Sequence, residues 1–186
     1  MFRTPHTQPD SAMPDGSIQF RQAVMTDIPE LHAVVERAYR GDSARAGWTN
    51  EADLVEGPRT TADALRATLG DPHQRLLLAL DGTAIVGCVE LSDRGEGTTY
   101  LGLLTVDPQR QAGGLGKQLL AAADAEARRS FGAVTMELTV IAQRAELIAY
   151  YERRGFAQTG ERRPFPVEVS PPLELLVLVK PLSRGA

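Results

Sequence analysis

A glycine-rich turn between an apolar run and an amphipathic segment is the feature that most constrains the fold of this chain. The apolar run at residues 101–106 predicts a strand, and glycines follow at positions 113, 114 and 116. The next residues place apolar side chains on one face of a helix. The first N–H groups of a helix have no intrahelical partner, the helix dipole adds positive charge there, and glycine lets a ligand approach the backbone. The segment therefore predicts an anion site at a helix N-terminus.

The spacing of this turn excludes two common nucleotide motifs. A P-loop needs Gly where this chain has Gln111, and Ser or Thr where it has Gln118. A dinucleotide fingerprint that starts at Gly114 needs a third glycine where Leu119 stands. The pattern that remains is Gln111-Ala112-Gly113-Gly114-Leu115-Gly116.

This six-residue pattern resembles the Gln/Arg-x-x-Gly-x-Gly/Ala signature of the GNAT superfamily of N-acetyltransferases. A second stretch, residues 147–156, resembles the family's Ala-x-x-Leu-Tyr-x-x-x-Gly-Phe element, with Tyr151 at the tyrosine position. Leu147 and Tyr150 depart from that element. The resemblance implies a GNAT-like acyl-CoA N-acyltransferase fold with acetyl-CoA as the cofactor. For the first motif alone, a loop that merely reverses the chain is the alternative.

The order of expected elements is typical of a mixed sheet with helices packed on it, an α/β fold of the α+β kind. The dipeptide Asp81-Gly82 is a strong signal for a type I′ hairpin. The resemblance covers residues 74–160, and more loosely 17–180. We expect strands at residues 17–23, 75–80, 83–91, 134–140, 156–160 and 173–179, with one more that ends at Val106. We expect helices at residues 28–38, 61–69, from the glycine turn to about 130, and at 143–154.

Length and composition limit the classes of function. The chain has 186 residues, the size of one domain, which we assign to residues 17–182, and residues 1–16 are expected to be a disordered leader. The net charge of −4 disfavours nucleic acid as the main partner. The single cysteine, Cys88, excludes an intrachain disulfide, and no Cys/His spacing indicates a metal site. The chain lacks an apolar run of ~20 residues and a signal-peptide pattern, so we expect no membrane partner and a cytoplasmic location.

The family resemblance assigns the cofactor to the turn and to the strand before it. It places the pantetheine of acetyl-CoA beside that strand, with the Val106 N–H as the expected donor to the thioester carbonyl. Arg144 stands near a position where the family often has Asn, and it could reach a phosphate instead. The expected cofactor residues are Leu104, Val106, Gln111, Ala112, Gly113, Gly114, Leu115, Gly116, Lys117 and Arg144.

Acetyl transfer to an amine needs an oxyanion donor, a proton acceptor for the amine and a proton donor for the leaving thiolate. Tyr151 is the candidate general acid, because a phenol keeps its proton at neutral pH. The adjacent Tyr150 leaves open which of the two tyrosines aligns with the tyrosine of the family element.

Many family members carry a glutamate near the position of Tyr100, on a strand that has no acid here. Glu90 on the preceding strand is the candidate base, acting through water, and proton loss to solvent is the alternative. Cys88 is expected to be a buried strand residue rather than a nucleophile.

The acceptor site is expected in two irregular stretches, residues 39–59 and 159–172, because functional residues concentrate in long loops. Trp48 is equally suited to the core. An acidic pocket would favour a polyamine or an aminoglycoside, whereas Arg59 near the pocket would favour an acceptor with a carboxylate, such as an amino acid. The expected acceptor residues are Tyr39, Trp48, Arg59, Tyr100 and Phe165.

Together these features predict an acetyl-CoA-dependent N-acetyltransferase that acts on a primary amine of a small molecule or peptide. The transfer would be direct, in a ternary complex, with no acyl-enzyme. The missing strand acid leaves open a non-catalytic acyl-CoA-binding sensor or regulatory module, although Tyr151 argues against it. Transfer to a hydroxyl, transfer of a longer acyl chain and a homodimer also stay open.

Overall fold

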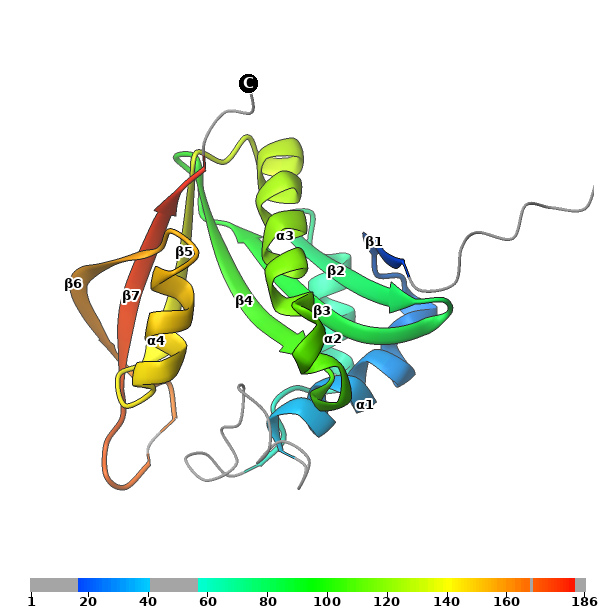
Figure 1. Cartoon of the computed structure of the whole chain (residues 1–186), viewed down its shortest axis with the longest axis horizontal. Helices are drawn as coiled ribbons and strands as arrows, with labels where there is room; N and C mark the ends of the chain where they lie inside the picture. The colour runs from blue at the N-terminus through cyan, green and yellow to red at the C-terminus, as the bar shows by residue number, and fades with distance from the viewer. Residues whose placement is uncertain (1–16, 41–56, 168, 183–186) are drawn as a thin grey trace, which may run out of the picture.

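The strands form one mixed sheet with helices on both faces (Figure 1). The computed structural model describes residues 17–40, 57–167 and 169–182. Within these ranges seven strands run in the order β1-β2-β3-β4-β5-β7-β6. Strands β4 and β5 are parallel, and the other neighbours are antiparallel. The expected fold class is confirmed. The expected leader lies outside the described residues, and the single-domain assignment stays a prediction.

Every expected strand and helix is present. Strand β6 continues past its expected end at residue 160. The strands are β1 (Ile18–Gln22), β2 (Gln74–Asp81), β3 (Ala84–Asp93), β4 (Thr98–Val106), β5 (Thr135–Ile141), β6 (Ala157–Pro164) and β7 (Glu174–Pro181). The helices are α1 (Ile28–Tyr39), α2 (Ala62–Gly70), α3 (Leu115–Phe131) and α4 (Ala145–Glu152), with short 3₁₀ turns η1 (Met25–Asp27) and η3 (Pro108–Gly113).

The sheet separates two apolar cores. The side chains of β2 alternate between the two faces of the sheet, and both faces are covered, so a continuous apolar sequence suits this strand. Leu76 and Leu78 pack in the core under α1 and α2, whereas Leu77 and Ala79 pack in the core under α3 and α4. Figure 1 shows α3 on one face of the sheet and α1 and α2 on the other. Burial on both faces explains why β2 and β3 read as unbroken hydrophobic stretches.

The hairpin between β2 and β3 forms as expected, but its turn type differs from the prediction. Asp81 pairs with Ala84, so the two loop residues are Gly82 and Thr83. Of the two, only Gly82 has a positive φ, at +61°. A type I′ turn needs positive φ at both central residues, whereas type II′ needs it at the first. The expected type I′ turn at Asp81-Gly82 is therefore wrong, because the β2 pairing extends through Asp81 and moves the loop by one residue.

Strands β4 and β5 separate part-way along their length (Figure 1). In the described sheet, residues 98–100 of β4 pair with residues 135–137 of β5, and the two strands then diverge. A register shift between Cys88 and Glu90 of β3 marks an extra residue in β4, where Leu103 has a φ of +45°. Such a bulge bends a strand and increases its twist. The bend in β4 therefore lies on the part of the strand that borders the gap.

Candidate active site

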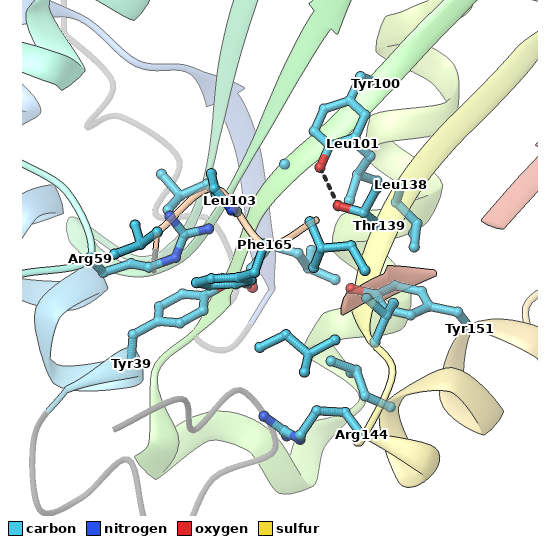
Figure 2. A pocket seen from close by; sticks show the side chains of 18 of the residues that line it. Tyr39, Arg59, Tyr100, Leu101, Leu103, Leu138, Thr139, Arg144, Tyr151 and Phe165 are labelled. Atoms are coloured by element: carbon cyan, nitrogen blue, oxygen red, sulfur yellow. Dashed lines mark hydrogen bonds between the residues drawn. The ribbon is translucent and has the colours of Figure 1, made fainter. Parts of the chain in front are cut away.

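A cavity of about 330 Å³ lies in the gap between β4 and β5 (Figure 2). Its lining comes from α1, the segment before α2, the middle of β4 (residues 100–104), β5, α4, the segment after β6 and the start of β7. Four of the five expected acceptor residues line it, namely Tyr39, Arg59, Tyr100 and Phe165. Trp48 lies outside the described residues. Residues that are more than a hundred positions apart in the sequence thus meet in one pocket.

The hydroxyls of Tyr100 and Thr139 are hydrogen-bonded across the start of the gap, 2.8 Å apart. Thr139 of β5 lines the cavity and was missed from the sequence. The alternation of apolar and polar residues in β5 could have indicated Thr139 from the sequence. Its apolar residues Met136, Leu138 and Val140 pack in the α3 and α4 core, which turns Thr139 to the opposite face. A polar residue on the open face of a strand beside the gap was therefore a candidate.

The main chain of β4 borders the cavity where the cofactor was expected. The Asp107 N–H donates to the Val86 carbonyl at 2.9 Å, toward β3. Since N–H groups alternate sides along an extended strand, the Val106 N–H is directed away from β3. Leu104 lines the cavity, and its carbonyl oxygen accepts a hydrogen bond of 2.8 Å from the Tyr39 hydroxyl. Tyr39, expected on the acceptor side, therefore also contacts the strand assigned to the cofactor.

Tyr151 reaches from α4 into the cavity, as Figure 2 shows. Its side chain is buried, and its ring packs edge-on against Phe156 with centroids 5.6 Å apart. Burial strongly raises the pKa of the Tyr151 phenol, and the other tyrosines around it add to this effect. Tyr150 does not line the cavity among the described residues, since neighbouring residues of a helix point about 100° apart. The geometry therefore favours the register in which Tyr151 is the functional tyrosine.

Glu90 lies next to the cavity rather than in its lining. It faces the α1 and α2 side of the sheet, as Cys88 does, and it pairs in register with Gly102. Burial raises the pKa of the Glu90 carboxyl, while the charge of Arg59 and a hydrogen bond with Thr68 oppose that shift. A raised pKa suits a proton acceptor, but the position requires a water molecule between Glu90 and a reacting amine.

The glycine turn has the geometry of an anion cradle. Gly114 is the N-cap of α3, and its φ of +71° lies in the left-handed region that favours glycine. No atom lies within 4 Å of the place where a Cβ would stand on Gly113 or Gly114, so the turn is open on that side. Gln111 and Ala112 lie in η3, Leu115 is buried in the core, and Lys117 is exposed in the first turn of α3. An open backbone cradle of this kind fits a cofactor phosphate.

Two arginines, Arg144 and Arg110, lie near the expected cofactor path and are paired with carboxylates. Arg144 lines the cavity and forms an ion pair of 2.6 Å with Glu146. Arg110, in η3, pairs at 2.7 Å with Asp81 at the end of β2. Both cations are thus close to the expected cofactor path, and each has an acidic neighbour on the protein.

A family model described as an acetyltransferase (GNAT) domain matches residues 50–165. The chain belongs to the GNAT acetyltransferase family. As a family member it is an acetyltransferase whose cofactor is acetyl-CoA, and the open glycine turn fits that cofactor. A search of curated proteins found no match.

Solved GNAT structures confirm the fold. The ribosomal-protein-S18-alanine N-acetyltransferase of Escherichia coli is 20% identical, with a TM-score of 0.70 over 91% of this chain and 97% of that one. The Salmonella typhimurium protein yncA, solved with its cofactor acetyl-CoA, is 20% identical, with a TM-score of 0.67 over 92% and 97%. The PaiA N-acetyltransferase of Thermoplasma acidophilum, in complex with coenzyme A, is 18% identical, with a TM-score of 0.68 over 89% and 99%. In the described part of this GNAT protein, no helix is long and apolar enough to cross a membrane.

Proposed function

We propose that this protein moves the acetyl group of acetyl-CoA directly to a primary amine of a small molecule or peptide, within a ternary complex. One observation carries the proposal. The cavity between β4 and β5 is bordered by the β4 main chain on one side, by Tyr39 and Arg59 on another, and by Tyr151 from α4. The cofactor strand, the acceptor residues and a proton donor therefore meet in one place.

The cofactor residues have separate roles in this proposal. The glycine turn and the start of α3 hold the pyrophosphate, and the β4 main chain at Leu104 and Val106 aligns the pantetheine. The Val106 N–H donates to the thioester oxygen as negative charge develops on it, because a fixed donor there stabilises the transition state. Arg144 lies at the cavity end of α4 and adds positive charge beside the cofactor.

Two proton transfers complete the reaction. The attacking amine must be neutral, and Glu90 takes its proton through water. Tyr151 donates its proton to the thiolate that leaves, which is consistent with a phenol kept protonated by burial. Cys88 supports direct transfer, because burial raises its thiol pKa to about 12 and its Sγ faces the Leu103 carbonyl at 3.7 Å. A buried, protonated thiol is not a nucleophile for an acyl-enzyme.

The acceptor pocket favours an amine that also carries a carboxylate. The Arg59 guanidinium lies 4.9 Å from the centre of the Tyr39 ring, and the backbone N–H of Arg59 donates to Glu36 at 2.8 Å. Arg40 also lines the cavity, while Leu103 and Phe165 supply apolar surface. A guanidinium beside an apolar wall suits an anionic group on an apolar body and is unfavourable for a polycation.

The test is thiol release from acetyl-CoA with a set of amines, matched in size, with and without a carboxylate. We expect faster release with the carboxylate-bearing amines, and a rise in KM for these amines alone in Arg59→Met. Equal rates for both groups of amines, or a preference for polyamines, would refute the acceptor class. Binding of acetyl-CoA without thiol release for any amine would instead support the acyl-CoA sensor, which the position of Glu90 outside the cavity lining leaves as the second candidate.

A further inference from the structure

Tyr150 of α4 reaches the first turn of α3. Its hydroxyl oxygen lies 2.5 Å from the place where a Cβ would stand on Gly116, and its ring Cζ lies 3.6 Å from that place. A side chain at position 116 would therefore collide with the phenol. The glycine at this position leaves room for Tyr150 at the helix start assigned to the cofactor pyrophosphate.

Arg154 holds this phenol in place. Its guanidinium carbon lies 3.4 Å from the centre of the Tyr150 ring, and its Nη1 donates to the Tyr150 carbonyl at 2.7 Å. The Tyr151 ring packs edge-on against the Tyr150 ring, with centroids 5.3 Å apart. A ring fixed between two neighbours presents its hydroxyl at a defined position, so little entropy is lost when that hydroxyl binds a ligand.

The Arg154 cation lies one phenol ring away from the N-terminus of α3. The Arg154 Nε is buried and has no hydrogen-bond partner among the described residues. Arg144 and Arg110 each have an ion pair with a carboxylate, whereas the described ion pairs include none for Arg154. A buried unsatisfied donor costs stability, and a cation near the positive end of a helix dipole is repelled by it. An anion bound at the helix start would offset the repulsion between this cation and the helix dipole.

We propose that Tyr150 and Arg154 bind the pyrophosphate of acetyl-CoA together with the start of α3. The Tyr150 hydroxyl donates to a phosphate oxygen, and Arg154 supplies the charge behind it. This role rests on the cofactor site of the proposed function. It gives the two neighbouring tyrosines different roles, because Tyr150 then contributes to cofactor affinity and Tyr151 to the chemical step.

Calorimetry with coenzyme A tests the affinity of the full-length protein and three variants. Arg154→Gln should weaken binding about tenfold, or about 1.4 kcal/mol. Tyr150→Phe keeps the ring and should weaken binding roughly threefold, as expected for loss of one hydrogen bond. Arg153→Gln is the matched control, because it removes the same charge from an exposed neighbour, and it should change the affinity less than twofold.

Acetyl-pantetheine, which lacks all the phosphates, separates binding of the anion from a structural effect. Arg154→Gln should leave the KM for acetyl-pantetheine at the wild-type value while it raises the KM for acetyl-CoA. Wild-type coenzyme A affinity in both Arg154→Gln and Tyr150→Phe, or an equal loss with both thioesters, overturns the proposal. If Arg154→Gln fails to fold, the result with Tyr150→Phe decides. Failure of the wild-type protein to bind coenzyme A would refute the cofactor site itself.

Discussion

Gly116→Ala is expected to destabilise the protein through its contact with Tyr150. The new Cβ would lie 2.5 Å from the Tyr150 hydroxyl oxygen, much closer than real Cβ contacts, but 3.6 Å from the ring Cζ, an ordinary contact. The phenol cannot move aside freely, because Arg154 stacks on its ring. Overpacking costs about 1–3 kcal/mol, and replacing a helical glycine with alanine offsets roughly 0.5–1 kcal/mol. We therefore expect a net loss of about 1–2 kcal/mol in the free energy of unfolding.

In a Tyr150→Phe background, Gly116→Ala should no longer lower the free energy of unfolding. With the hydroxyl removed, Gly116→Ala should be neutral or stabilising by up to roughly 1 kcal/mol. Urea unfolding of the four proteins in this cycle measures the coupling energy, which we expect at about 1–3 kcal/mol. Gly113→Ala is the control, because nothing lies within 4 Å of its Cβ position. If Gly116→Ala costs as much in the Tyr150→Phe background as in the wild-type protein, the reasoning about this contact is wrong.

Three further predictions concern the site. Tyr151→Phe should lower kcat by about 10²- to 10⁴-fold with little change in acetyl-CoA affinity, by steady-state kinetics and calorimetry, and a near-normal kcat would remove its general-acid role. Gly114→Val should weaken acetyl-CoA binding, because a β-branched residue is strained at a φ of +71°; an unchanged Kd in a folded variant argues against the turn. The pKa of Glu90 is higher in the folded protein than in the unfolded chain, so protonated Glu90 favours the folded state. This stabilisation is complete at pH values below the pKa of the unfolded chain, and it is lost as the pH rises through the pKa of the folded protein. Glu90→Gln should remove this loss, and parallel unfolding profiles against pH for the two proteins would contradict it.

The fold could be predicted from the sequence because local and global signals agree. The glycine turn, the apolar runs and the alternation from Val134 to Val140 each specify one element, and Gly132, with a φ of +62°, ends α3 where expected. Tyr151 was predicted for the site, and the structure places it in the cavity. The one-residue shift of the hairpin loop at Gly82 came from pairing in β2, which local turn preferences do not report.

Other parts of the site have no local sequence signal. The bulge at Leu103 places a leucine at positive φ, a conformation that its residue type disfavours and only the tertiary structure imposes. Arg154 belongs to a run of charged residues that is typical of a solvated helix face. Its spacing from Tyr150 is that of helical neighbours, but only the fold brings the Tyr150 hydroxyl to Gly116. The contact of Tyr39 with Leu104 joins residues 65 positions apart. Such contacts depend on packing and cannot be derived from spacing in the chain.

Direct transfer to an amine is the central claim, and it is tested by following thiol release from acetyl-CoA together with the masses of the product and of the intact protein. Direct transfer predicts thiol release that depends on the added amine, an amine product heavier by one acetyl group, and no acetyl adduct on the protein. Release at the same rate without any amine, or an acetylated protein that forms before the product, would contradict it.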